Sequence, residues 1–69
     1  MELSARNQLA ATVKSVRLGT ITAEVVLELN GGQELVAAIT RGSAEHLHLQ
    51  PGDRAFALVK ATELMVGIP

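Results

Sequence analysis

The segment Glu45-His46-Leu47-His48 carries the side chains of this 69-residue chain that most resemble metal ligands. Residues two positions apart on a helix point in different directions, which disfavours a metal ion shared by His46 and His48. With no cysteine, the chain offers no thiolate ligand and no disulfide. Because it also has no nucleophile beside a general base and no paired carboxylates, we expect exposed histidines, no metal site and no enzyme activity.

Charge is almost balanced along the chain. Six basic and seven acidic residues give a net charge of −1, and no run of like charges occurs. Such a chain has no long-range positive field, and its single aromatic residue, Phe56, cannot form a stacking surface for bases. We therefore expect no nucleic-acid partner, and a bound anion needs a few local donors that converge.

The apolar content is high for so short a chain, at 48% of residues. The apolar runs are too short to span a membrane, and the N-terminus lacks the pattern of a signal peptide, so we expect a cytoplasmic protein without a membrane partner. Residues 1–69 form one domain at most. Since a domain this small usually needs a disulfide, a metal or a partner chain, we interpret the apolar excess as surface that another copy covers.

Alternation of apolar and polar residues predicts the strands. The expected strands are residues 7–18, 21–29, 34–40, 54–60 and 63–68. The alternation slips by one position near Lys14-Ser15, which predicts a β-bulge that bends the first strand. Asn30-Gly31 predicts a hairpin between the second and third strands, because both residues tolerate positive φ.

A short helix is expected between the third and fourth strands, with Ser43 as its N-cap. In the fourth strand we expect Phe56 and Leu58 to point inward, and in the fifth Leu64, Val66 and Ile68 to share one face. The order β-β-β-α-β-β predicts an all-β fold, a five-stranded OB-like barrel with one short helix between strands 3 and 4.

Four segments of the chain resemble one known family. Ser4-Ala5-Arg6-Asn7-Gln8 resembles the SARNQ signature of the molbindin (Mop) family, whose members have a TOBE-type OB fold. Three further segments agree with the family in order and spacing. They are the GGQELVA hairpin at residues 31–37, the I-T-x-x-S-A-E segment at residues 39–45, and the K-A-S/T-x-x-M-V ending at residues 60–66. The resemblance covers essentially the whole chain.

The resemblance implies a molybdate- or tungstate-binding protein without an organic cofactor. It further implies a homohexamer, a trimer of dimers, with the oxyanion held at subunit interfaces. Carried over residue by residue, the family's main site consists of Ser4 and Arg6 from one subunit and Thr40, Ser43, Lys60 and Ala61 from its neighbour. The family also has a second type of site near the three-fold axes, to which no residue of this sequence is assigned.

These residues suit the chemistry of such a ligand. Molybdate is a tetrahedral dianion that only accepts hydrogen bonds, so its site needs donors. Arg6 offers a planar fork, Lys60 a point charge, and the hydroxyls rotate to donate. Arg41-Gly42 departs from the family's usual residues at these positions, and we expect the glycine to loosen the loop that presents Ser43.

Each assignment has a structural alternative. Thr40 is either a ligand contact or a strand-end residue, and a lone arginine such as Arg6 is usually a solvated charge unless the motif applies. Asn7 and Gln8 are expected to hold the turn into the first strand through backbone bonds. For the whole chain, the alternatives to oxyanion storage are a regulatory oxyanion-sensing TOBE module and, ranked far lower, an OB-type nucleic-acid-binding domain.

Overall fold

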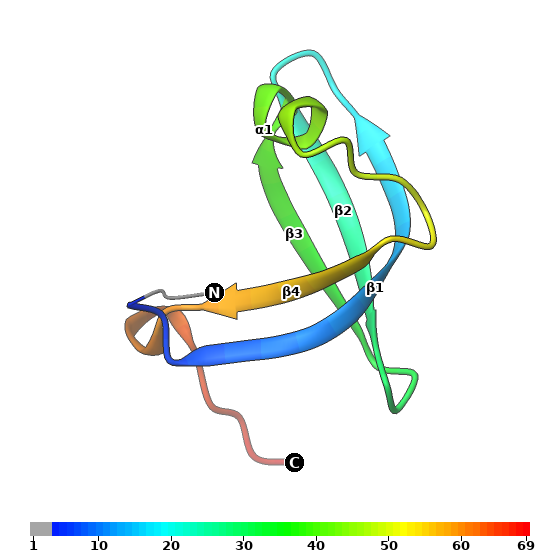
Figure 1. The fold of residues 1–69 in the computed structure, drawn as a ribbon. Coiled ribbons are helices and arrows are strands. Elements are labelled where there is room, and N and C mark those ends of the chain that lie inside the picture. The colour runs from blue at the N-terminus through cyan, green and yellow to red at the C-terminus, as the bar shows by residue number, and fades with distance from the viewer. Residues whose placement is uncertain (1–3) are drawn as a thin grey trace.

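The computed structural model describes residues 4–69 as a curved antiparallel sheet with a short helix at one end (Figure 1). The strands are β1 (Asn7–Leu18), β2 (Thr22–Leu29), β3 (Glu34–Thr40) and β4 (Arg54–Val59), and the helical segments are α1 (Arg41–His46) and the 3₁₀ turn η1 (Ala61–Glu63). The sheet order is β3-β2-β1-β4, so β3 and β4 form its two edges. Neither helical segment has the length or hydropathy of a membrane span.

The bend in β1 allows one strand to serve both halves of the sheet. The register of β1 against β2 shifts between Val13 and Ser15, which confirms the predicted bulge at Lys14. The first half of β1 pairs with β4 and the second half pairs with β2. At the bulge, the amide and carbonyl of Val13 bond to the Asp53 carbonyl and the Gly52 amide, each at 2.8 Å. The backbone polar groups of the bend are thus paired with the loop that enters β4.

The predicted hairpin between β2 and β3 is also present. The positive φ of the turn lies at Gly32, at 86°, and not at the expected Asn30-Gly31. The Leu29 amide donates to the Gln33 carbonyl at 2.7 Å, and the Gly32 amide donates to the Leu29 carbonyl at 2.9 Å. The hairpin brings the inward residues of β3 against the core, as expected.

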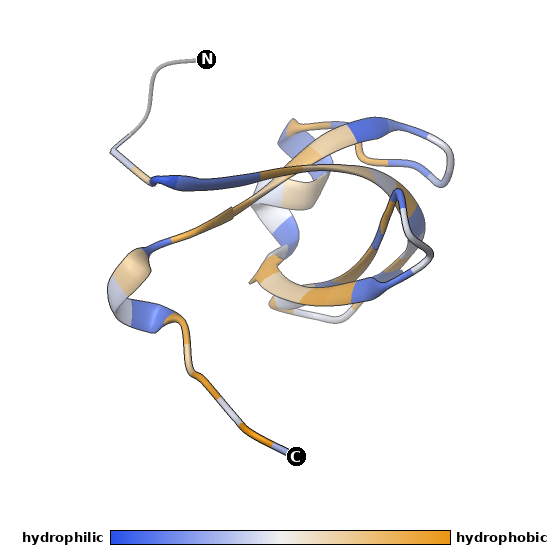
Figure 2. Cartoon of the chain, turned by 90° about the horizontal axis from the view of Figure 1, so that it is seen from below, coloured by the Kyte–Doolittle hydropathy of each residue, from blue (hydrophilic) through white to orange (hydrophobic). Residues whose placement is uncertain are grey.

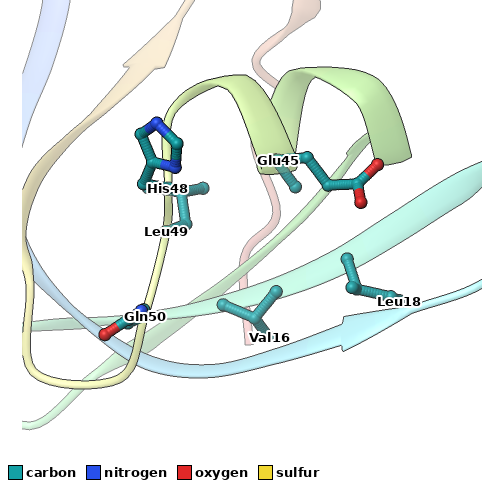
Figure 3. A pocket seen from close by; sticks show the side chains of 7 residues that line it. Val16, Leu18, Glu45, His48, Leu49 and Gln50 are labelled. Atoms are coloured by element: carbon teal, nitrogen blue, oxygen red, sulfur yellow. The ribbon is translucent and has the colours of Figure 1, made fainter.

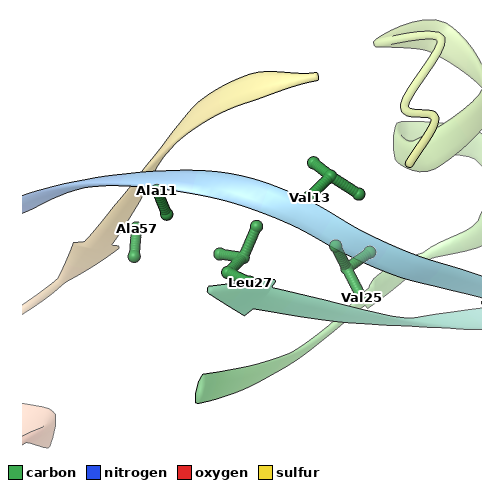
Figure 4. Packing of buried hydrophobic residues seen from close by; sticks show 5 residues of the cluster. All are labelled: Ala11, Val13, Val25, Leu27 and Ala57. Carbon is green, nitrogen blue, oxygen red and sulfur yellow. The ribbon is translucent and has the colours of Figure 1, made fainter. Parts of the chain in front are cut away.

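The core is small and built mostly from short side chains (Figure 4). Its buried cluster consists of Ala11, Val13, Val25, Leu27 and Ala57. With so few large side chains inside, the free energy gained by burial within one chain is limited.

The prediction that Phe56 and Leu58 point inward is wrong. Phe56 is 56% exposed and Leu58 is 44% exposed, whereas Ala57 between them is buried. The register explains the difference, because Ala57 lies opposite Leu9 on β1 and so shares the face of β1 that also carries the buried Ala11. Both faces of β4 carry apolar residues, so alternation alone did not identify the inner one.

The helix starts earlier than expected. Its N-cap is Thr40 rather than Ser43, and the cap has extended dihedrals (φ −70°, ψ 149°). The Thr40 side chain accepts a hydrogen bond from the Ser43 amide, the usual N-cap arrangement. Gly42, expected to loosen a loop, lies instead within the first turn of α1.

The expected fifth strand at residues 63–68 is absent from the described part of the chain, which contains four strands and a half-barrel instead of a closed five-stranded barrel. After η1 the chain extends away from the sheet as an apolar tail (Figure 2). Met65, Val66 and Ile68 are each at least 90% exposed. The alternation there is real, but a strand forms only where a sheet edge accepts its backbone bonds.

Candidate functional site

Two of the expected site residues, Thr40 and Ser43, are joined at the junction of β3 and α1. The Ser43 amide donates to Thr40 Oγ1 at 3.0 Å, and the Thr40 hydroxyl donates to Ser43 Oγ at 2.7 Å. Both residues are exposed, so their outer side is open to a ligand or to another chain. We refer to these two side chains as the hydroxyl pair.

The hydroxyl pair lines a shallow hollow on the surface of α1. Gly42, His46 and Leu47 complete its lining. His46 was expected only to be exposed, yet its spacing of three from Ser43 puts both residues on one helix face. That spacing is the signal that identifies His46 as a neighbour of the hydroxyl pair.

The other four expected site residues lie at the opposite end of the sheet, where β1 begins and β4 ends. Asn7, the first residue of β1, pairs with Val59, the last residue of β4. Arg6 directly precedes Asn7 and Lys60 directly follows Val59, so both cations lie at the same corner of the sheet. Ser4 and Ala61 lie further outward from this corner, on the segments that precede β1 and follow β4. We call Ser4, Arg6, Lys60 and Ala61 the corner group, and its members are all exposed.

Side-chain bonds to the backbone hold the corner. Asn7 Nδ2 donates to the Val59 carbonyl at 3.1 Å, and Gln8 Nε2 donates to the Ala5 carbonyl at 2.9 Å. These bonds confirm the expectation that Asn7 and Gln8 hold the turn into β1. Lys60 caps η1, and its carbonyl accepts the Glu63 amide at 2.9 Å. Hydrogen bonds thus hold the backbone next to Arg6 at the start of β1 and the backbone next to Lys60 at the end of β4.

Within one chain the hydroxyl pair and the corner group lie at opposite ends of the half-barrel. Figure 1 shows α1 at one end, and the start of β1 with η1 at the other. Thr40 pairs with Thr22, next to the β1–β2 turn, while Arg6 lies at the opposite end of β1. A single chain thus does not bring the six residues together. Their division between subunits stays a prediction, because one chain is described.

The two histidines face different hollows. His46 lines the hollow of the hydroxyl pair, whereas His48 lines a pocket of about 300 Å³ beneath α1 (Figure 3). This agrees with the expectation that they point in different directions. In residues 4–69 no group of three acidic, histidine or cysteine side chains is placed to hold a metal ion.

The pocket beneath α1 is a poor site for an anion. Its polar lining includes the Glu45 carboxylate, and its apolar lining includes Val16, Leu18 and Leu49 (Figure 3). A carboxylate in an apolar pocket repels an oxyanion, which leaves the hydroxyl pair and the corner group as the suitable donors.

Comparison with known proteins identifies the family. The TOBE domain model matches residues 3–66. Molybdenum-pterin-binding protein 1 of Clostridium pasteurianum is 42% identical over 66 residues, which are 96% of this chain and 97% of that protein. A molybdate-binding protein from Sporomusa ovata is similar in structure, with a TM-score of 0.92 and 51% identity over 99% of this chain and 100% of the other.

A third comparison includes a bound ligand. The cytoplasmic molybdate-binding protein ModG, in a form with molybdate bound, has a TM-score of 0.94 and 42% identity. All of this chain is covered, but only 49% of ModG. The match of sequence and fold to these proteins agrees with the four motif segments. This chain therefore belongs to the TOBE domain family, and within it to the molbindin (Mop) proteins.

Proposed function

We propose that this protein binds molybdate or tungstate and stores the oxyanion in the cytoplasm, without acting on it chemically. The observation that carries the proposal is the donor chemistry of the hydroxyl pair and the corner group, in a chain whose relatives are named for molybdate or molybdenum binding. The cytoplasmic location follows the description of ModG.

The charges of the corner group match those of the ligand. Molybdate carries two negative charges, and Arg6 with Lys60 supplies two positive ones. Arginine bonds two oxygens at once through its fork, and charge-assisted bonds of this kind are about twice as strong as neutral ones. Ser4 and Ser43 add neutral donors, and the Ala61 backbone amide adds another. Such a site contains donors only, which suits an ion that only accepts.

We propose that the complete site forms between copies of the chain. The hydroxyl pair and the corner group lie at opposite ends of one half-barrel, so a neighbouring copy has to supply one of them. The family's homohexamer, a trimer of dimers, provides such contacts. The family resemblance implies a different division, in which Ser4 and Arg6 come from one subunit and the remaining four residues from its neighbour. Within one chain Lys60 and Ala61 lie beside Arg6 and far from the hydroxyl pair, so the two divisions differ in the subunit that supplies Lys60 and Ala61.

The apolar surfaces of the chain support assembly. A groove of about 600 Å³ lies open between the edge strands β3 and β4, lined mainly by apolar residues. The tail beyond η1 exposes Leu64, Met65, Val66 and Ile68. Exposed apolar surface on this scale is unusual for a monomer and is typical of interfaces. Burying it between copies stabilises a chain whose own core is small.

The ligand of this proposal is the oxyanion alone. The name of the Clostridium relative includes a pterin, but the donors described here suit an acceptor-only ion rather than a flat heterocycle. Selectivity over sulfate, which has the same charge and shape, then depends on the size of the assembled cavity.

Titration calorimetry with molybdate, tungstate, sulfate and free pterin tests the proposal. We expect molybdate and tungstate to bind at micromolar or lower concentration, and sulfate and pterin to bind far more weakly. Arg6→Ala is expected to abolish binding without changing the assembly seen by sedimentation. The proposal fails if no oxyanion binds, or if a stable monomer binds molybdate as tightly as the oligomer.

A further inference from the structure

The hydroxyl pair offers a ligand one outward proton rather than two. Thr40 accepts the Ser43 amide and donates its own proton to Ser43 Oγ. A hydroxyl has a single proton, so the proton of Thr40 is used inside the pair. The proton of Ser43 is then the one that points to a ligand. Its direction depends on where the first turn of α1 is held.

The helix is too short to hold itself. α1 has six residues, and Ala44 is its one buried side chain. Isolated helices of this length are unstable in water, because nucleation costs more than a few bonds return. Gly42 in its first turn weakens it further, because glycine loses more backbone freedom on folding than any other residue. Contacts outside the helix must therefore fix the position of Ser43.

Arg41, the first residue of α1, makes such contacts to the β1–β2 turn. Its amide donates to the Ile21 carbonyl at 2.8 Å, and its Nη1 donates to the Gly19 carbonyl at 3.3 Å. Its Nε lies 3.5 Å from Glu45 Oε1, one turn along the helix. The side chain thus joins the turn to two points of α1.

The β1–β2 turn is a firm support for this contact. The Gly19 amide donates to the Thr22 carbonyl at 2.7 Å. A Cβ built on Gly19 would lie 2.9 Å from the same carbonyl oxygen, closer than side chains tolerate. The turn is closed so tightly that it accepts glycine alone without shifting.

We infer that Arg41 is a positioning residue of the oxyanion site: it ties the start of α1 to the β1–β2 turn and so holds Ser43 where its hydroxyl meets the ligand. The inference rests on the proposed function. The guanidinium acts through Ser43, and its bonds are directed at Gly19 and Glu45 instead of at the anion.

The test compares molybdate affinity in Arg41→Met and in a matched control, Arg17→Met. Arg17 also lies 3.5 Å from a carboxylate, that of Glu24, and near the same end of the sheet, but within residues 4–69 its side chain forms no hydrogen bond with α1. Both variants remove one positive charge, so the loss of charge cancels in the comparison. We expect Arg41→Met to weaken binding about tenfold and Arg17→Met to weaken it less than about twofold.

A double-mutant cycle separates positioning from direct attraction. If Arg41 acts through the Ser43 hydroxyl, Arg41→Met has almost no further effect on affinity once Ser43→Ala has removed that hydroxyl. If Arg41 attracts the anion itself, the two losses add. Additive losses overturn the inference, as do equal affinities of Arg41→Met and Arg17→Met.

Circular dichroism and sedimentation establish that each variant is folded and assembled. Should Arg41→Met fail to fold, Arg41→Lys runs the same cycle, since it keeps the charge and stem but lacks the fork that reaches both Gly19 and Glu45. Absence of molybdate binding in the unmodified protein overturns the proposed function. If the unmodified protein binds molybdate, and Arg41→Met or Arg41→Lys binds it with the same affinity, only the inference about Arg41 is overturned.

Discussion

The side-chain amide of Asn7 donates to the backbone carbonyl of Val59 at 3.1 Å, and so joins the first residue of β1 to the last residue of β4. Arg6 and Lys60 are the next residues outward on the two strands. The bond therefore sets the separation of the backbones from which the two cations extend. An interaction that looks structural in one chain thereby affects the proposed ligand site.

Removing this bond should change both stability and binding. We expect Asn7→Ala to lower the free energy of unfolding by about 1 kcal/mol, because the Val59 carbonyl loses its side-chain donor. Molybdate affinity should fall as well, since the corner group is less well ordered. Gln33→Ala is the control, because it removes an exposed side-chain amide from the β2–β3 hairpin and leaves the bonds of the corner group in place. Denaturant unfolding and calorimetry measure the two effects, and equal affinities of both variants would contradict this role of Asn7.

The two members of the hydroxyl pair should respond differently to mutation. Ser43→Ala keeps the amide that Thr40 accepts, so we expect weaker molybdate binding with little change in stability. Thr40→Val removes the N-cap and should lower the free energy of unfolding by about 1 kcal/mol. Thr40→Ser retains a hydroxyl and is expected to restore most of both properties. The assignment of separate roles is wrong if Ser43→Ala destabilises as much as Thr40→Val.

Mixed oligomers can test which residues come from different copies. When Arg6→Ala and Ser43→Ala chains are unfolded together and reassembled in equal amounts, a site shared between copies regains both residues in about a quarter of cases. A site contained in one chain regains none. The stoichiometry of molybdate binding, measured by calorimetry, distinguishes the two results.

The same mixing experiment with Arg6→Ala and Lys60→Ala tests the division implied by the family. We expect about a quarter of the sites to recover if Arg6 and Lys60 belong to neighbouring subunits. No recovery would assign both cations to one copy, as their shared sheet corner permits. Each single variant reassembled alone serves as the control and should bind no molybdate.

The ion pair at the bulge predicts a pH dependence of stability. A hydrogen bond from Lys14 to Glu34 raises the pKa of the Lys14 ammonium above its usual 10.5, and the charge of Glu34 adds to this effect. Because the folded-state pKa is the higher one, the contribution to stability is complete below the unfolded pKa. It is lost as the pH rises through the folded-state value.

Lys14→Met measures this contribution. We expect the unfolding midpoint of the variant to lie slightly below that of the unmodified protein between about pH 7 and pH 9, where the lysine is charged in both the folded and the unfolded state. The difference should shrink as the pH rises above about 10.5. It should be small throughout, because Lys14 and Glu34 are exposed and surface pairs contribute little. A difference that grows with rising pH would contradict the pairing.

Much of the sheet could be predicted from local sequence. The slip near Lys14 predicted the bulge and Asn30-Gly31 predicted the hairpin, because both depend on dihedral preferences and alternation within a few residues. The N-cap was misplaced by three positions, since Thr40 and Ser43 both suit a cap. The backbone decides between them, because Thr40 is the residue with extended dihedrals before the helix.

The errors occurred where a distant partner decides the structure. Phe56 and Leu58 face outward because the register with β1 puts Ala57 inside. The apolar tail at residues 64–69 alternates like a strand, yet a strand needs a sheet edge to bond to, and among residues 4–69 no edge pairs with it. Alternation shows which residues share a face, but not which face is buried or whether a partner strand exists.

By itself the sequence determined the family, the donor types of the candidate site and most of the strands, because these depend on residue identity and short-range pattern. Only the tertiary structure decided how those donors are distributed. It joined Thr40 to Ser43, tied Arg41 to the β1–β2 turn, and separated both from Arg6 and Lys60 by the length of the half-barrel. Such distances depend on strand pairing between residues far apart in the chain, which no local pattern encodes.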